Sequence, residues 1–490
     1  MKQFVSKVLM LIAFLSISMS ASGYDFEADG IYYRVTSASD FTCAVTNGQQ
    51  GNVFTGDNLY EGDVIIPAHV DYKNKTLTVT SIDGWAFYKC SQLNTVMIPE
   101  TVIEIGTGAF EGCTNLTSID LPNSVTELGS SIFERCTALK NIHLPEDIKH
   151  ISSHMFSDCT AIESILLPPS VVGIGSSAFM NCSNLGSIDF PDGIEYIDAN
   201  SFKNCTKISK IKLPYSLITI GDCAFEGLNL IQKLVLPESL EHIGTYAFSN
   251  CSELMEIDIV SSTKPLYFNI VRLGETCGTF FGCPKLTNLT LGREVQLYDT
   301  YFNSSRYLRT KWIFDGNITT LTIQNNVNFW EVFSEKNFSE SLENLTFGTY
   351  NFANQIRLYD YSKLKVIAIT TSIPPKCPWF SDKQRMDIIL KVPNGSLDAY
   401  KTTDGWKNFW NIEEMDDSSS GIDNINNNYD ISIRTNDGSI AIQNKAESSI
   451  VRIYNLQGQL IKETYQSEIP GLPRGVYILS IDNHSFKIAI

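Results

Sequence analysis

The amino-acid sequence predicts a mainly β chain with short helical or 3-10 turns, built as a solenoid of 23-residue repeats and followed by a small C-terminal β-sandwich. Two sets of residues recur at this step of 23 and carry the prediction. The first is a phenylalanine, at Phe87, Phe110, Phe133, Phe156, Phe179, Phe202, Phe225 and Phe248. The second is a proline, at Pro99, Pro122, Pro145, Pro168, Pro191, Pro214 and Pro237. A period of about 20–29 residues with an apolar skeleton is typical of leucine-rich-repeat solenoids, which mainly offer long binding surfaces.

Each repeat contains the elements of one solenoid coil. Apolar and polar residues alternate at 118–121, which predicts a short strand. Pro122 should end that strand, because proline has no backbone N–H to donate to a sheet. The segment 125–128 then predicts a return segment, which a second short strand would suit, and Gly129 marks a turn. We expect the segment 131–136 to be a single helical or 3-10 turn.

A third set of residues at the same step is a row of cysteines, here called the Cys ladder. Its members are Cys90, Cys113, Cys136, Cys159, Cys182, Cys205, Cys251 and Cys283. A metal site is not expected, since no C-x-x-C cluster occurs. Stacked positions also point their Cβ atoms in parallel, which suits a disulfide poorly, so we expect buried, reduced thiols. Cys43, Cys223, Cys277 and Cys377 lie outside the ladder, and a Cys277–Cys283 bridge stays open.

The N-terminus predicts export. Lys2 and Lys7 precede an apolar run at 8–17 and small residues at 18–23, a pattern typical of a cleaved signal peptide and too short to span a membrane. No later segment reaches the length of a membrane span, so none is expected in the mature chain. The net charge of −17 argues against a nucleic-acid partner.

The chain divides into several expected domains. The regular period stops near residue 259, because the next Phe-x-x-Cys begins at Phe280, 32 residues after Phe248. Polar residues with serine and glycine predict a linker at 416–429, and three hairpin patterns follow it. In order, the expected domains are the signal peptide 1–22, an N-terminal cap 23–80, the solenoid 81–390 (irregular after about 259), a C-terminal capping unit 391–415, the linker 416–429 and a sorting-like β-sandwich 430–490.

Candidate binding residues flank the inward positions of each predicted strand, because side chains alternate between the two faces of a strand. They are Ser118, Asp120, Asn141, His143, Ser164, Ser187, Asp189, Lys210, Lys212 and Lys233. These positions vary while the apolar skeleton does not, which suits an adaptable binding face. The alternative is that they are solvated positions under no selection. The three lysines form the one basic spot of this predicted face.

The sequence contains no recognisable catalytic motif. No G-x-S-x-G, H-E-x-x-H or Walker A pattern occurs, so we expect no catalysis, no cofactor and no metal site. His150 and His154 would share one face of a helix, but the repeat pattern places them in a strand and a turn. The alternative hypothesis is a secreted enzyme or glycan-degradation accessory protein with its site in residues 260–390. A pocket of carboxylates and exposed tryptophans there would favour it.

The repeat pattern L-x-x-I-x-L-P-x-S-V-x-x-I-G-x-x-A-F-x-x-C resembles the BspA-like leucine-rich repeats of Bacteroidetes surface proteins, and residues 162–182 and 231–251 match it almost throughout. Residues 26–33 and 392–412 are similar to the terminal units of the same family. The resemblance implies a secreted or cell-surface adhesin at the exterior of the outer membrane. It implies as partner a host extracellular or bacterial surface protein or glycan, and a monomeric state.

The tail resembles the C-terminal sorting domain of the type IX secretion system. Residues 451–461, 472–478 and 487–490 carry this similarity. The Tyr-Pro-Asn-Pro opening common in such domains is absent, and Asn428-Tyr429-Asp430 stands near its place. The resemblance implies export by this route and attachment to the cell surface.

Overall fold

The structure is a computed structural model. It describes residues 23–48, 60–270, 278–299, 304–306, 318–324, 327, 338, 341–348 and 358–415, together with 432–436, 439–443, 451–454, 460–464, 466–469, 472, 476–481 and 484–489 of the tail. The chain forms two compact units, one of residues 1–365 with 378–384 and one of 366–377 with 385–490. The expected signal peptide, the linker 416–429 and Cys277 lie outside the described residues.

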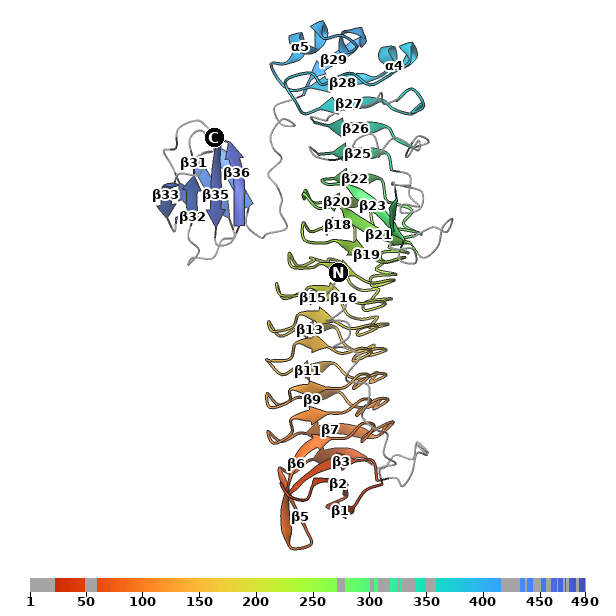
Figure 1. Ribbon diagram of the computed structural model, residues 1–490, viewed down its shortest axis with the longest axis vertical. Coiled ribbons are helices and arrows are strands. Elements are labelled where there is room, and N and C mark those ends of the chain that lie inside the picture. Colours follow the sequence, from red (N-terminus) through yellow and green to blue (C-terminus); the bar gives the residue numbers. More distant parts are fainter. Residues whose placement is uncertain are drawn as a thin grey trace. The chain divides into compact units, whose positions relative to one another are not determined.

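The first unit is a stack of coils, each formed by one repeat, with two rows of parallel strands (Figure 1). The strands that follow the Cys ladder form face 1: β7 (Leu93–Met97), β9 (Ser118–Asp120), β11 (Asn141–His143), β13 (Ser164–Leu166), β15 (Ser187–Asp189), β18 (Lys233–Leu236), β20 (Glu256–Ile259), β22 (Asn288–Leu291), β25 (Thr320–Ile323) and β26 (Asn344–Phe347). Paired residues such as Ile119 and Ile142 stand one repeat apart.

The return segments form face 2, so the second short strand is present in each regular coil. Its strands are β8 (Glu104–Ile105), β10 (Glu127–Leu128), β12 (His150–Ile151), β14 (Gly173–Ile174), β16 (Tyr196–Ile197), β17 (Thr219–Ile220), β19 (His242–Ile243), β21 (Leu266–Ile270) and β23 (Val295–Asp299), with β24 (Ser304–Arg306) antiparallel to β23. The predicted fold class, a mainly β leucine-rich-repeat solenoid, is confirmed.

The repeating phenylalanines form the centre of the stack. Every ring from Phe87 to Phe248 is fully buried. Neighbouring rings stack with centroids 4.9 to 5.8 Å apart. Each buried ring contributes about 1.5–3 kcal/mol through the hydrophobic effect. No coil can bury its own ring alone, so the stack is stable only as a whole.

The Cys ladder lies beside the rings as buried free thiols. Each thiol from Cys113 onward donates to the carbonyl oxygen of the phenylalanine in the preceding coil, with Sγ–O distances from 3.0 to 3.6 Å. Burial raises the pKa of Cys182 to about 12. The ladder thiols therefore stay protonated and act as donors between coils. Outside the ladder, Cys43 is buried, while Cys223 and Cys377 are half-buried, all three as free thiols.

The segment around each ladder phenylalanine differs from the expected helical or 3-10 turn. Ser131 and Arg135, two residues before and after Phe133, have left-handed φ values of 57° and 61°. Residues in this conformation interrupt a right-handed helix. Their amides instead donate to the next coil, to the carbonyl oxygens of Ser153 and Ser157 at 2.9 and 2.8 Å. The segment is a run of tight turns that forms a third contact between coils.

Gly129 also has a different role from the one expected. A Cβ atom there would lie 2.4 Å from the backbone nitrogen of Thr107 in the preceding coil. Its φ is not left-handed. Glycine is required because two backbones approach closely, and not because the chain turns.

The N-terminal residues end the stack with a sheet. It contains β1 (Phe26–Ala28), β2 (Ile31–Ser37), β3 (Thr42–Thr46), β5 (His69–Tyr72) and β6 (Lys75–Ile82), and β6 continues it into face 2 through β8. The ring of Tyr60 lies on Phe87, with centroids 4.6 Å apart, and its hydroxyl donates to the Thr46 carbonyl at 2.6 Å. In face 1, β4 (Gly62–Ile65) pairs with β7.

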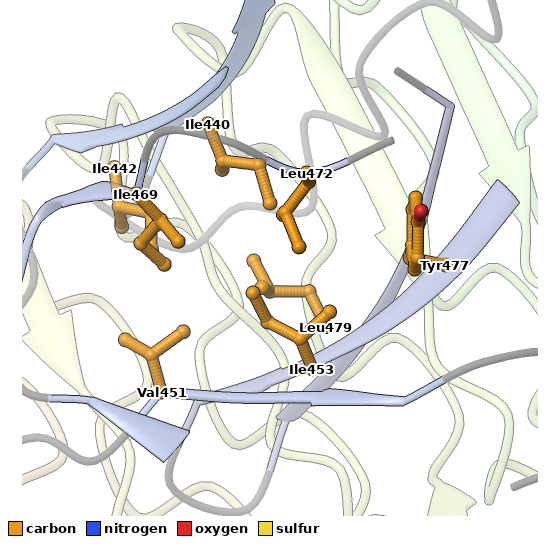
Figure 2. Packing of buried hydrophobic residues seen from close by; sticks show 8 residues of the cluster. All are labelled: Ile440, Ile442, Val451, Ile453, Ile469, Leu472, Tyr477 and Leu479. Carbon is orange, nitrogen blue, oxygen red and sulfur yellow. The ribbon is translucent and has the colours of Figure 1, made fainter. Parts of the chain in front are cut away.

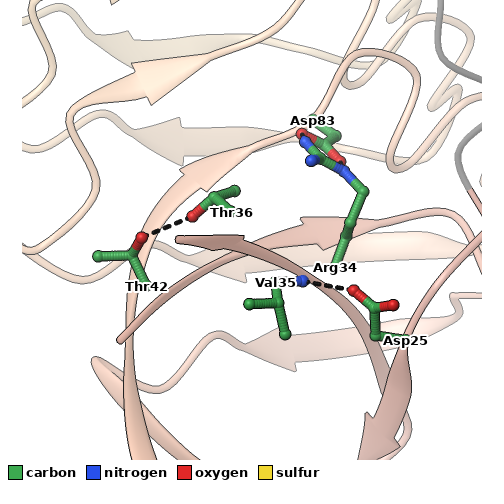
Figure 3. A network of polar contacts seen from close by, with 6 residues as sticks. All are labelled: Asp25, Arg34, Val35, Thr36, Thr42 and Asp83. Carbon is green, nitrogen blue, oxygen red and sulfur yellow. Dashed lines mark hydrogen bonds and ion pairs between the residues drawn. The ribbon is translucent and has the colours of Figure 1, made fainter. Parts of the chain in front are cut away.

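An ion pair fastens this sheet to the first coil. Two guanidinium nitrogens of Arg34, Nη2 and Nε, donate to the two carboxylate oxygens of Asp83, at 2.6 and 2.8 Å. Figure 3 shows this pair beside two further contacts, between Asp25 and the Val35 amide and between Thr36 and Thr42. The two-point geometry holds β2 in one orientation.

The second unit begins with parallel strands β27 (Val366–Ile369), β28 (Ile389–Val392) and β29 (Asn411–Glu414). The helix α4 (Asp382–Asp387) precedes β28, and α5 (Leu397–Thr402) and η1 (Trp406–Asn408) precede β29. Tyr400 and Trp406 are fully buried, and the Trp406 indole donates to the Pro375 carbonyl at 2.5 Å.

The tail contains two antiparallel sheets. One consists of β30 (Ser432–Asn436), β31 (Ser439–Gln443) and β34 (Glu468–Ile469), and the other of β32 (Val451–Tyr454), β33 (Leu460–Thr464), β35 (Val476–Ile481) and β36 (His484–Ala489). The three expected hairpins are β30–β31, β32–β33 and β35–β36. Eight buried side chains, seven from the two sheets and Leu472 from the segment between β34 and β35, form one cluster (Figure 2). They are Ile440, Ile442, Val451, Ile453, Ile469, Leu472, Tyr477 and Leu479.

Candidate binding surfaces

Face 1 presents the candidate residues in rows. Strand pairing sets Ser118 beside Asn141, Asp120 beside His143 and Ser164 beside Ser187. Ser118 is half-buried, and the others are exposed: Asp120, Asn141, His143, Ser164, Ser187, Asp189, Lys210, Lys212 and Lys233. The segment that carries Lys210 and Lys212 is extended chain between β15 and β18 and is not itself assigned as a strand.

The predicted basic spot is smaller than expected. The ammonium nitrogen of Lys233 lies 2.7 Å from carboxylate oxygens of both Glu256 and Asp258 on the next coil. Burial lowers the pKa of Lys233, and its hydrogen bonds to these two carboxylates outweigh burial and raise it overall. Lys233 is therefore neutralised within the face by its two acidic neighbours. Sequence reasoning missed the pairing because its partners lie one repeat further on.

Apolar side chains also project from face 1. Ile65 and Met97 stand side by side on β4 and β7, 66% and 63% exposed. Leu166 on β13 is 84% exposed. The signal for these residues is an apolar side chain at an outward position of an alternating strand. Single exposed apolar residues are common, whereas an adjacent pair beside polar rows suits a binding surface.

Face 2 carries aromatic residues that sequence reasoning did not select. The Tyr196 hydroxyl forms a 2.8 Å hydrogen bond with Nδ1 of His150, two coils away. Burial lowers the pKa of His150, which favours the neutral ring as the partner of this hydroxyl. Further along, His242 stacks on Tyr267 with centroids 5.1 Å apart. The rings of His242 and Tyr298 are in edge-to-face contact, with centroids 5.3 Å apart. Aligning the repeats on the first residue of each return strand would have revealed this row.

The histidines considered as metal ligands are not brought together. His143 lies on face 1, His150 lies on face 2 and His154 occupies a left-handed turn position. Among the described residues, no group of three or more His, Cys, Asp or Glu side chains is arranged to hold a metal ion. No helix in the described part of the chain is long and apolar enough to cross a membrane.

Residues 260–390, the region proposed for the alternative enzymatic site, are only partly described. Six aromatic residues of this region lie outside the described residues: Tyr301, Phe302, Trp312, Phe329, Trp330 and Phe333. That hypothesis therefore stays a prediction.

Comparisons with known proteins agree on the repeats. The family model described as BspA type leucine rich repeat region matches in six copies, over residues 72–186 and 172–309. A leucine-rich repeat protein of T. pallidum is 28% identical, with 42% of this chain and 90% of that chain covered and a TM-score of 0.36. One from Bacteroides ovatus is 22% identical over 80% of this chain and 100% of that one, with a TM-score of 0.42.

A leucine-rich cell surface protein from Faecalibacterium prausnitzii is 19% identical over 82% of this chain and 97% of that one, with a TM-score of 0.43. No curated protein matches the chain significantly. The family match covers the coils whose Phe, Pro and Cys positions recur at one step. Residues 72–309 therefore match the model of the BspA type leucine rich repeat region, as their repeat pattern predicted.

Proposed function

We propose that this chain is a secreted or cell-surface adhesin that binds a partner protein through face 1 and carries out no catalysis. The partner would be a component of host matrix, of a mucosal surface or of another bacterium. The observation that carries the proposal is the separation of roles within each face 1 strand. Ile119, Ile165 and Ile188 point inward and are buried. The residue after each inward position faces outward and varies along the stack, as Asp120, His143 and Leu166 do.

This separation allows the surface to change without loss of the fold. Exposed substitutions away from caps and networks usually change stability by less than about 0.5 kcal/mol. Loss of a core residue costs several times more. A stack with a constant core can therefore present many different surfaces, which suits recognition better than a fixed chemical reaction.

The chemistry of face 1 also suits a protein partner. Leu166 and the pair Ile65 and Met97 can each be covered by an apolar side chain. Asp120, Asp189 and Lys210 are exposed along the same face and can select the charge of a partner. Interfaces commonly combine apolar anchors with a polar rim in this way.

The exported location rests on two segments. Residues 1–22 have the pattern of a signal peptide, and residues 430–490 resemble a sorting domain, which we infer to be a delivery signal rather than part of the binding surface. The similar protein of F. prausnitzii is described as a cell surface protein. Deleting residues 416–490 should abolish display on the parent cell and leave binding by the purified chain intact. Unchanged display would refute the sorting role.

A direct test is binding of the mature chain to immobilised matrix proteins and mucins. Leu166→Asp places a charge at the most exposed apolar position of face 1. It should weaken binding to the protein identified in this screen by about tenfold, which is ~1.4 kcal/mol. Tyr215→Ala, at an exposed tyrosine in the turn between the faces, is the matched control. Equal binding by both variants, or no binding to any protein in the panel, would count against face 1.

A further inference from the structure

Tyr196 lies flat on the surface of face 2. A Cβ atom built on Gly173 would fall 2.0 Å from Cζ of Tyr196, and 2.3 and 2.5 Å from its two neighbouring ring carbons. Because three adjoining ring atoms are almost equally near, the ring rests its face, and not its edge, on the glycine. The tyrosine is half-buried, so one face covers the sheet and the rest of the side chain reaches the surface.

Gly173 has no conformational reason to be glycine. Its φ is not left-handed, and it sits in strand β14. Glycine in a strand is unfavourable unless something must approach the backbone closely. Here the close group is the Tyr196 ring. Glycine at residue 173 therefore lowers the strand propensity of β14, and it leaves the space that the flat ring of Tyr196 occupies.

The ring is also held in place at its far end. Its hydroxyl is bonded to His150 at 2.8 Å, and the two rings are 29° from parallel. The contact with Gly173 and the hydrogen bond to His150 already fix the Tyr196 ring. The ring therefore loses little conformational entropy when a ligand binds to it.

The platform belongs to a longer row. Strand pairing sets His150, Gly173, Tyr196, Thr219, His242 and Tyr267 side by side in that order. Neighbouring strands are about 4.8 Å apart, so the Cα atoms of Tyr196 and His242, two strands apart, are separated by about 10 Å. Small residues, Gly173 and Thr219, alternate with the aromatic ones. The positions of the row repeat from coil to coil along the stack, and the units of a linear polymer also repeat in one direction.

The polar groups beside the row indicate the charge of its ligand. The carboxyl groups of Asp198 and Glu195 are close enough to Tyr196 to add to the effect of burial, which raises the pKa of its hydroxyl. Glu241 beside His242 is paired with Lys264. Carboxylates accept hydrogen bonds from hydroxyl groups and repel anions, and the whole chain carries a net charge of −17. An acidic polymer is thus disfavoured and a neutral polyhydroxyl ligand is favoured.

We propose that this row on face 2 binds a neutral linear polysaccharide, of which one sugar ring stacks on Tyr196 and another contacts the His242–Tyr267 pair. Pyranose rings present apolar C–H faces to an aromatic platform and hydroxyl groups to the carboxylates at its side. The site lies on a different face from the adhesion surface proposed above. Failure of either proposal therefore leaves the other standing.

Native affinity gels test this with the full mature chain. The gels contain mixed-linkage β-glucan, galactomannan or arabinoxylan, and a heparin gel serves as the anionic comparison. We expect retardation by at least one neutral polymer. Tyr196→Ala should weaken that binding about five- to tenfold, since it removes the ring on which a sugar stacks.

Three further variants separate binding from folding. Gly173→Ala should displace the ring and weaken binding several-fold, although residue 173 itself would touch no sugar. Tyr196→Phe keeps the platform and should bind nearly as well as the native chain. Tyr215→Ala, outside the row, should bind normally. Circular dichroism and the urea midpoint of each variant check the fold, and Tyr267→Ala carries the test if Tyr196→Ala does not fold.

The outcomes are distinct. Weaker binding by Gly173→Ala, and by Tyr196→Ala or Tyr267→Ala, with native binding by Tyr215→Ala, supports the site. The proposal is overturned by no retardation in any neutral gel, by retardation in heparin alone, or by folded Tyr196→Ala and Tyr267→Ala variants that bind as the native chain does. In that last case the aromatic row only stabilises neighbouring strands.

Discussion

The regular coils and the coil with the insertion differ on the surface and agree in the core. Strands of face 2 are two residues long up to β19, whereas β21 and β23 have five residues each. Yet Phe280 still stacks on Phe248 with centroids 5.6 Å apart, and the thiol of Cys283 still donates to the Phe248 carbonyl at 3.3 Å. The stack continues past the insertion because Phe280 and Cys283 keep the contacts of the regular coils, and because β20 still pairs with β22.

Arg293 shows how the coil that follows the insertion is attached. It is fully buried and donates to the carbonyl oxygens of Pro237 and Glu238 at 2.9 and 2.8 Å. Burial lowers its pKa to about 10. A regular coil fills its interior with apolar side chains, whereas this coil also uses a cation to bind the backbone of an earlier coil.

The largest expected effect concerns the rings common to both regions. Phe179→Ala should lower the free energy of unfolding by about 3–5 kcal/mol, because it leaves a cavity between two stacked rings. Phe280→Ala should cost a similar amount if the coil with the insertion is part of the same cooperative stack. Urea denaturation of both variants measures this. A normal main transition for Phe280→Ala would show that the two regions unfold separately.

Arg293→Ala should have the next largest effect. It leaves two buried carbonyl oxygens without their donor, which costs about 1–3 kcal/mol. Hydrogen exchange should show faster opening of β21 and β23, with the regular coils less affected. Arg293→Lys is the matched control, since it retains a charge but cannot reach both carbonyls with a planar fork. Unchanged exchange in Arg293→Ala would mean that the insertion is held by other contacts.

The thiols give a pH dependence with a defined sign. The pKa of Cys182 is about 12 in the folded chain, against 9.0 as the ordinary value. Between these values the unfolded thiol is ionised and the folded one is not. Stability from this group is therefore complete below pH 9 and is lost as the pH rises, by about 1.4 kcal/mol per pH unit.

Cys182→Ala should make the loss of stability between pH 9 and 11 less steep, measured by urea midpoints. An unchanged slope would contradict the assigned burial. In the native chain near neutral pH, alkylating reagents should modify Cys223, which is half-buried, before Cys182.

The smallest expected effect is at the surface. Leu166→Asp on face 1 should change the free energy of unfolding by less than about 0.5 kcal/mol, because its side chain is 84% exposed. A thermal or urea midpoint measures it. A loss above 1–2 kcal/mol, the range of a lost buried contact, would mean that Leu166 belongs to the core and not to a binding surface.

Prediction from sequence succeeded where a contact repeats at one step. The buried rings, most of the thiols and the strands of most regular coils recur at a step of 23 residues, so their pattern is visible in a single chain. It failed where the cause lies in a neighbouring coil. Lys233 was expected to be a basic group of the face, and it is paired with Glu256 and Asp258. The turn at Ser131 was expected to be helical, and backbone bonds to the next coil hold it in a left-handed conformation.

Residue spacing alone was therefore sufficient for the fold class, the repeat family and the buried side of each strand, since burying apolar surface requires a periodic pattern. Only the stacked coils determined which outward residues meet. Tyr196 lies on Gly173 and bonds His150 because the register of face 2 sets residues 23 and 46 positions apart beside each other. Side chains that far apart in the chain are brought together by coil stacking, and no local preference of the sequence encodes their contact.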